Sequence, residues 1–87
     1  MVLVYMKDRR LKVGFSASSK VGGAIVRNRI RRFMKEDFRM LRKDLKPGRY
    51  VFTARVLSAK LPHQALTSEM SRLLERAGLF REKEDKS

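Results

Sequence analysis

Four arginines and a lysine lie between positions 27 and 35, close behind a loop that carries two adjacent glycines. A guanidinium group is planar and always charged, so it can donate paired hydrogen bonds to phosphate oxygens or to the edges of nucleobases. Cations at this density are typical of a surface that binds a polyanion. We expect the cations of that surface to be Lys20, Arg27, Arg29, Arg31, Arg32, Lys35 and Arg39.

Uncharged side chains near this basic segment can add more specific contacts. Asn28 lies between two arginines. It can bond to a sugar or a base edge, or it can instead help to cap the start of a helix. Tyr5 and Phe15 can stack on unpaired bases. Packing in the core is the commoner fate of an aromatic residue on a strand, and this alternative is stronger for Phe15.

No constellation of residues predicts a catalytic or metal site. His63 is the only histidine, and its place beside Pro62 favours a solvated or capping histidine over a catalytic one. The serines at positions 16, 18 and 19 have no nearby base, and no two carboxylates are spaced for paired acid–base chemistry. The Lys20-Val-Gly-Gly sequence lacks the residue order of a phosphate-binding P-loop. Without cysteine, no thiolate can bind zinc, and we expect no metal or cofactor on the protein itself.

The net charge favours nucleic acid as the partner. The 87 residues include 22 Lys and Arg against 9 Asp and Glu, a formal charge of +13. Residues 1–58 hold 16 cations and 4 anions, whereas residues 59–87 hold 6 and 5, so the excess is localised. Apolar runs are far shorter than the ~20 residues of a membrane span. No signal-peptide pattern is visible, and a cytoplasmic location is expected.

Strand patterns occupy the first part of the chain. Residues 1–6 are apolar and β-branched, and residues 11–17 alternate between apolar and polar or small side chains, as half-buried strands do. The charged residues 7–10 between them predict a hairpin turn. Residues 18–24 form a loop with Gly22 and Gly23.

Helical spacing begins at about residue 24 and continues to residue 44. At about 100° per residue, the cations and Asn28 fall on one half of this helix. Asp37 is the exception, because it lies within the apolar half and the pattern gives no reason for it. The apolar half is expected to contain Val26, Ile30, Phe33, Met34, Phe38, Met40 and Leu41.

The remaining elements complete an α+β domain. Pro47 and Gly48 end the basic helix, and residues 50–57 are rich in the β-branched and aromatic residues of a strand. A second helix is predicted from Pro62 to about residue 77, with Gly78 as its C-terminal stop. The order β-β-α-β-α predicts a small sheet packed with two helices in one domain, residues 1–80, and the net charge predicts that this domain binds nucleic acid. Residues 81–87 are predicted to be a charged, disordered tail.

The stretch from Leu11 to Glu36 resembles the signature of the bacterial ribonuclease P protein subunit. In that family a strand ending in Gly-x-Ser-x-Ser/Lys-Lys leads through a glycine turn into an Arg-Asn-Arg helix, which here is Arg27-Asn28-Arg29. The similarity continues through residues 50–55 and the final helix. It implies a non-catalytic subunit that binds ribonuclease P RNA and precursor tRNA. The RNA, with Mg²⁺, removes the 5′ leader.

The resemblance also implies where each RNA binds. Residues 27–29, together with Arg31, Arg32 and Lys35, would face the catalytic RNA. A cleft between the sheet and the basic helix would hold the single-stranded leader, and Tyr5, Phe15 and Ser16 are its candidate contacts, with Tyr5 the best placed for stacking. The family's βαβ crossover is left-handed, contrary to the general right-handed rule.

Three features depart from the family pattern. Members carry an N-terminal helix before the first strand, with aromatic residues for the leader cleft, whereas this sequence starts at that strand. Ser19 and Gly23 also occupy positions where the family usually has a basic and a polar residue. Two alternatives stay open: an RNA-binding module without a link to catalysis, such as a ribosome-associated protein, and a membrane-surface protein with a basic amphipathic helix. The second would remove Phe33, Phe38 and Leu41 from a small core, so no membrane partner is expected, and no protein partner is evident.

Overall fold

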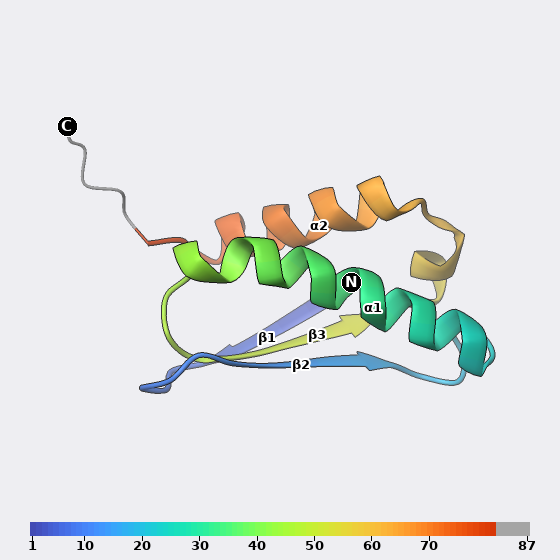
Figure 1. Ribbon diagram of the computed structural model, residues 1–87, viewed down its shortest axis with the longest axis horizontal. Coiled ribbons are helices and arrows are strands. Elements are labelled where there is room, and N and C mark those ends of the chain that lie inside the picture. The colour runs from blue at the N-terminus through green and yellow to red at the C-terminus, as the bar shows by residue number, and fades with distance from the viewer. Residues whose placement is uncertain (82–87) are drawn as a thin grey trace.

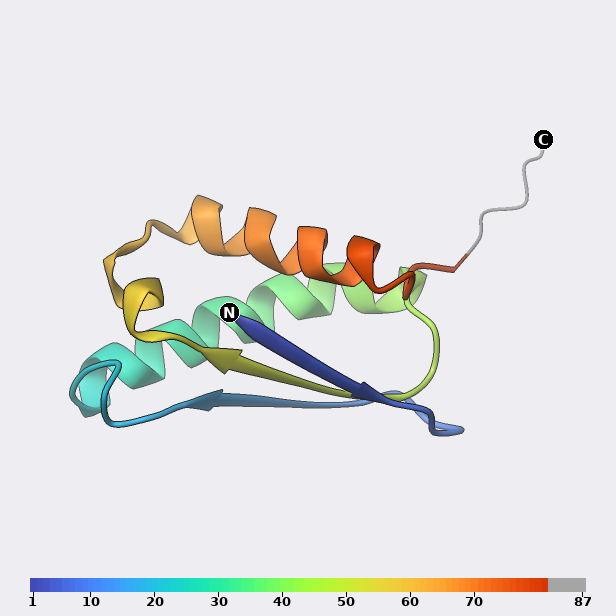
Figure 2. The same ribbon diagram turned by 180° about the vertical axis from the view of Figure 1, so that it is seen from behind.

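The computed structural model describes residues 1–81 as two layers, a mixed sheet and a pair of helices that cover one of its faces (Figure 1). The view from behind shows the same arrangement, with the opposite face of the sheet left uncovered (Figure 2). The α+β class and the order of the main elements are therefore as predicted. In chain order the elements are β1 (Val2–Met6), β2 (Lys12–Ala17), α1 (Ala24–Leu41), the 3₁₀ turn η1 (Arg42–Asp44), β3 (Arg49–Ala54), the 3₁₀ turn η2 (Val56–Lys60) and α2 (His63–Arg76).

The strand order is β1-β3-β2, so the predicted hairpin between the first two strands is wrong. β3 lies between them, antiparallel to β1 and parallel to β2. The physical reason is hydrophobicity on the helix-facing side of β3, where Tyr50, Phe52 and Ala54 are all buried and require neighbours on both sides. α1 is the crossover between the parallel strands, and its left-handedness stays a prediction.

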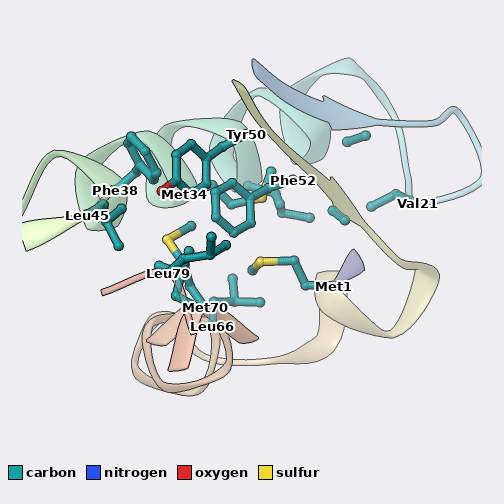
Figure 3. Close-up of a cluster of buried hydrophobic side chains, with 14 residues drawn as sticks. Met1, Val21, Met34, Phe38, Leu45, Tyr50, Phe52, Leu66, Met70 and Leu79 are labelled. Carbon is teal, nitrogen blue, oxygen red and sulfur yellow. The ribbon is translucent and has the colours of Figure 1, made fainter. Parts of the chain in front are cut away.

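The core lies between the sheet and the two helices (Figure 3). Pairing places Leu3, Phe52 and Phe15 in one row across the helix-facing side of the sheet. Phe38 of α1 packs on this aromatic surface with its ring centroid 5.7 Å from that of Phe52. Met70 of α2 is fully buried on the other side of the cluster. The basic helix is thus anchored to the sheet by apolar packing, which leaves its outer side for other contacts.

β3 ends at Ala54, three residues before the predicted end at Leu57. The backbone turns into η2 because the buried Ser58 hydroxyl accepts a hydrogen bond from the amide of Arg55, at 3.0 Å. This local bond offers the backbone an alternative to the sheet ladder. As a result Val56 and Leu57 are exposed by 51% and 69%, although their types suit a strand.

The apolar half of α1 differs from the prediction at one position. Ile30, Met34 and Phe38 are buried as expected, whereas Met40 is 71% exposed. The helix ends at Leu41 and gives way to η1, so the predicted continuation to residue 44 holds only as a tighter 3₁₀ turn. The last turn of a helix is often a 3₁₀ turn, so this difference is ordinary at a helix end.

The C-terminal stop of α2 is confirmed, because Gly78 adopts a left-handed φ of 69° just after the helix. Arg81, predicted as the first residue of a disordered tail, is instead held in place. Its amide donates to the carbonyl of Asp44 at 2.7 Å, and its Nε donates to the carbonyl of Leu45 at 3.1 Å. The rest of the predicted tail, residues 82–87, lies outside the described residues.

Because of Tyr50, the stability of this core should depend on pH in the alkaline range. Burial, with a smaller contribution from the charge of Tyr5, raises the pKa of Tyr50 to about 12. An unfolded tyrosine titrates near pH 10, so between about pH 10 and pH 12 the unfolded chain loses this proton and the folded chain keeps it. The free energy of unfolding should therefore fall by up to ~1.4 kcal/mol per pH unit in that window.

Urea denaturation at several pH values above about 9 measures this fall. Tyr50→Phe is the matched control, because it removes only the Tyr50 hydroxyl. The variant loses the hydrogen bond to the Lys46 carbonyl and is less stable at every pH, but its stability should decline less steeply. Equal slopes for both proteins would contradict the assignment.

Candidate nucleic-acid interface

The outer side of α1 carries the predicted cations in solvent. Arg29, Arg32, Lys35 and Arg39 are all exposed. The Arg32 guanidinium carbon lies over the ring of Phe33, 5.9 Å from its centroid. No aspartate or glutamate lies in the first turn of the helix, so nothing there counters the positive N-terminal end of its dipole. The solvent-facing surface of α1 is suited to binding an anion with several charges.

Arg27 and Asn28 lie differently from what the pattern predicts. Arg27 is half-buried, and its Nε atom is buried without a hydrogen-bond partner within residues 1–81. The stem of this arginine therefore packs against the fold, and less of it faces solvent than predicted. Asn28 does not cap the helix, because the N-cap is Gly23 and no side chain bonds there. Its Oδ1 accepts a hydrogen bond from Arg31 at 2.7 Å, which orients that guanidinium group.

A groove lies between α1 and β2, which is an edge strand of the sheet. Its volume is about 350 Å³, and both aromatic and cationic side chains line it. Phe15 lies at this edge with its ring stacked on Phe52 at 6.0 Å, so it is mainly a core residue. Arg42 is a lining residue that the sequence prediction omitted, although its position on the basic half of the helix could have indicated it. The full lining is Val13, Gly14, Phe15, Lys35, Phe38, Arg39 and Arg42.

The structure does not bring the three predicted leader contacts together. Tyr5 lies on β1, at the opposite edge of the sheet from Phe15. Its hydroxyl donates to the Pro47 carbonyl at 2.6 Å, and its ring meets Tyr50 edge-on at 5.0 Å. Ser16 is exposed, and because it follows Phe15 along the strand it points to the uncovered face of the sheet. Tyr5 therefore cannot share one groove with Phe15.

Tyr5 instead lines a hollow of about 440 Å³ beside the loop that joins β1 to β2. The hollow also contains Lys7, Arg9 and Lys46. Asp8 in the same loop accepts a hydrogen bond from the backbone of Arg10, which keeps the pKa of that carboxyl below its usual value. The sequence prediction did not list these cations, because they are scattered along the chain and come together only in the fold.

Lys20 occupies a third position, at the carboxyl ends of β2 and β3. It lines a hollow of about 400 Å³ together with Ser18 and Arg55. Gly22, with φ of 159°, approaches Val26 so closely that an added Cβ would lie 2.9 Å from Cγ1. The glycine loop therefore packs tightly against the start of α1.

Neither a cluster of metal ligands nor a membrane-spanning helix occurs within residues 1–81. Within residues 1–81 no group of three or more histidine, aspartate or glutamate side chains gathers that could hold a metal ion. In the same part of the chain, no helix is long and apolar enough to cross a membrane.

A small α+β domain with an exposed basic helix and basic grooves is the architecture of an RNA-binding protein. Residues 1–78 match the model of the ribonuclease P family. The protein is 40% identical over 75 residues to the ribonuclease P protein component of Nitratiruptor sp., covering 86% of this chain and 69% of that protein. It is 36% identical to that of Caldanaerobacter subterraneus, over 95% of this chain and 75% of the relative. The chain belongs to the ribonuclease P protein family, and is thereby assigned to the protein subunit that acts in 5′ maturation of tRNA.

Solved structures agree with this fold. The ribonuclease P protein of Staphylococcus aureus, solved at 2.0 Å, matches with a TM-score of 0.84 and covers 91% of this chain and 75% of that one. A second structure of the S. aureus protein matches with a TM-score of 0.76 over 95% and 74% of the two chains. Identity is 21% in both comparisons, so they show the fold alone.

Proposed function

We propose that this protein docks on ribonuclease P RNA through the outer side of α1 and holds the 5′ leader of precursor tRNA nearby. The RNA component, with Mg²⁺, carries out the hydrolysis in the cytoplasm. The protein's own residues bind and orient the two RNAs. Family membership supports the partnership with ribonuclease P RNA, whereas the contact with precursor tRNA rests on the grooves beside α1.

One observation carries the docking proposal: Arg29, Arg32, Lys35 and Arg39 of α1 are exposed, and no cation of this helix takes part in the ion pairs formed within residues 1–81. Those ion pairs are Met1 with Glu69, Lys12 with Asp8 and His63 with Asp37. Side by side on one helix, like charges repel each other by a few tenths of a kcal/mol per pair. A phosphate backbone removes this repulsion and releases counterions, which is the main driving force of protein–RNA association.

The groove between α1 and β2 supports the leader proposal. Lys35, Arg39 and Arg42 can bind the phosphates of a single strand that follows the groove. The edge of the Phe15 ring provides an apolar surface for a base. Because β2 is an edge strand, its unpaired backbone groups can also bond to sugars or bases.

The absence of cysteine permits a direct test of the docking surface, because one introduced thiol can carry a cleavage reagent to a chosen point. Glu36→Cys places an iron chelate among the cations of α1, on an exposed position outside the proposed contacts. Ser68→Cys places the same chelate on the exposed side of α2 as a matched control. We expect radicals from position 36 to cut ribonuclease P RNA at discrete sites, and those from position 68 to cut weakly or elsewhere.

The same experiment separates the alternatives. Ribosomal RNA at equal concentration should not be cut at discrete sites from position 36. Equal, diffuse cutting of both RNAs from both positions would indicate binding by charge alone and would contradict the proposed docking surface.

A further inference from the structure

Asp37 is a carboxylate among the apolar residues of α1, only 8% exposed. Its Oδ1 accepts a hydrogen bond from the Thr67 hydroxyl at 2.9 Å, and the Nε2 atom of His63 lies 3.0 Å from the same oxygen. Its Oδ2 is buried without a partner within residues 1–81. A buried carboxylate is costly unless it is paired, so its presence requires the two donors that α2 supplies.

The sequence suggested a solvated or capping histidine at position 63. The side chain of His63 is 37% exposed, but it caps no helix and lies against Asp37 instead. Its ring stacks on Phe33, with centroids 4.2 Å apart and planes 9° from parallel. Phe33 is also the ring over which the Arg32 guanidinium group lies. Contacts thus run without a break from the buried Asp37, through His63 and Phe33, to a cation on the exposed side of α1.

We propose that Asp37, His63 and Phe33 are positioning residues that hold Arg32 on the RNA-binding side of α1. Asp37 fixes the plane and the location of the imidazole, and the imidazole fixes the Phe33 ring between the two helices. The ring then offers Arg32 a face on which to rest, which limits the rotamers that a free arginine would explore. An arginine held in one orientation loses less entropy when it binds a phosphate.

This proposal rests on the proposed function and adds a specific role for α2. In this proposal α2 does not contact the RNA. It supplies His63 and Thr67, which contact the Asp37 carboxylate of α1. Arg39, two turns further along α1, lines the groove beside β2, so it offers an internal comparison.

A double-mutant cycle in RNA affinity tests the coupling. His63→Ala and Arg32→Ala should each weaken binding to ribonuclease P RNA, by about threefold or more in each case. The double variant should bind no more weakly than Arg32→Ala alone, because the arginine that His63 positions is already gone. The cycle of His63→Ala with Arg39→Ala should instead be multiplicative. Gln64→Ala, on the exposed residue next to His63, is the matched control and should bind like the unmodified protein.

Two conservative variants keep the test valid if His63→Ala folds poorly. His63→Phe keeps a ring on Phe33 and loses the bond to Asp37, so it should lose less RNA affinity than His63→Ala while lowering stability. His63→Gln keeps a donor for Asp37 and loses the ring, so it should lose as much affinity as His63→Ala. Circular dichroism at the assay temperature establishes folding for each protein.

The outcomes are distinct. Multiplicative effects of His63→Ala and Arg32→Ala, or equal RNA affinity of His63→Phe and His63→Gln, would overturn the positioning role while leaving docking on the RNA intact. Failure of the unmodified protein to bind ribonuclease P RNA would overturn the proposed function itself.

Discussion

Replacing Arg29, Arg32 and Arg39 together with alanine is expected to weaken binding to ribonuclease P RNA roughly a hundredfold at moderate salt. All three side chains are exposed on α1, so their removal leaves the core intact. Each arginine that contacts a phosphate releases about one counterion, so the slope of log K against log salt should become shallower by roughly 2 to 3. Filter binding or fluorescence anisotropy over a range of salt concentrations measures both quantities.

The matched control removes the same charge elsewhere. Lys60, Arg72 and Arg76 are exposed outside α1, on η2 and α2. Their triple alanine variant lowers the net charge by the same three units and should change affinity only slightly, through the long-range field. Equal losses in both triple variants would show that net charge alone drives binding, and the assignment of α1 as the docking surface would then be wrong.

The sequence predicted the elements better than their pairing. Period-two alternation identified β2, and the 3.6-residue period identified both helices, because each pattern reflects one buried face. The hairpin between β1 and β2 was wrong because a short charged loop does not determine which strand lies next to which. That choice depends on β3, whose buried Tyr50 and Phe52 take the centre of the sheet and lie far along the chain from β1.

The candidate site could be predicted where clustered cations also follow the 3.6-residue period of a helix. Four of the predicted cations, Arg29, Arg32, Lys35 and Arg39, are exposed on α1 as the helical pattern indicated. The pattern could not show that Asp37 has a partner, because His63 is 26 residues away and reaches it only when α2 packs on α1. Phe33 was assigned to the core for its type, whereas its ring also contacts Arg32 at the surface.

The leader contacts were the least predictable part. Tyr5 and Phe15 were grouped as strand aromatics, but strand order puts them at opposite edges of the sheet, with β3 between. Ser16 was named with them from the family resemblance, although neighbouring residues on a strand point to opposite faces. The contacts that we propose for the leader are therefore Lys35, Arg39 and Arg42, which gather beside β2 in the fold.

The second large effect concerns the reaction itself. Precursor tRNA and ribonuclease P RNA are both polyanions, and in the absence of protein only a high concentration of Mg²⁺ screens their repulsion. A protein with a formal charge of +13 that binds both can replace part of that screening. At low Mg²⁺ we expect it to raise the rate of leader removal by about tenfold or more, the factor that ~1.4 kcal/mol of added substrate binding supplies. The benefit should shrink as Mg²⁺ is raised.

The most direct measurement of the central claim is 5′ processing of precursor tRNA by the matching RNA at low Mg²⁺, with and without this protein. Addition of the protein should accelerate cleavage at the mature 5′ end. The variant without Arg29, Arg32 and Arg39 should need a much higher concentration for the same rate, and the one without Lys60, Arg72 and Arg76 should behave like the unmodified protein. No acceleration by the folded protein, including a form with any upstream residues that its gene encodes, would contradict the account.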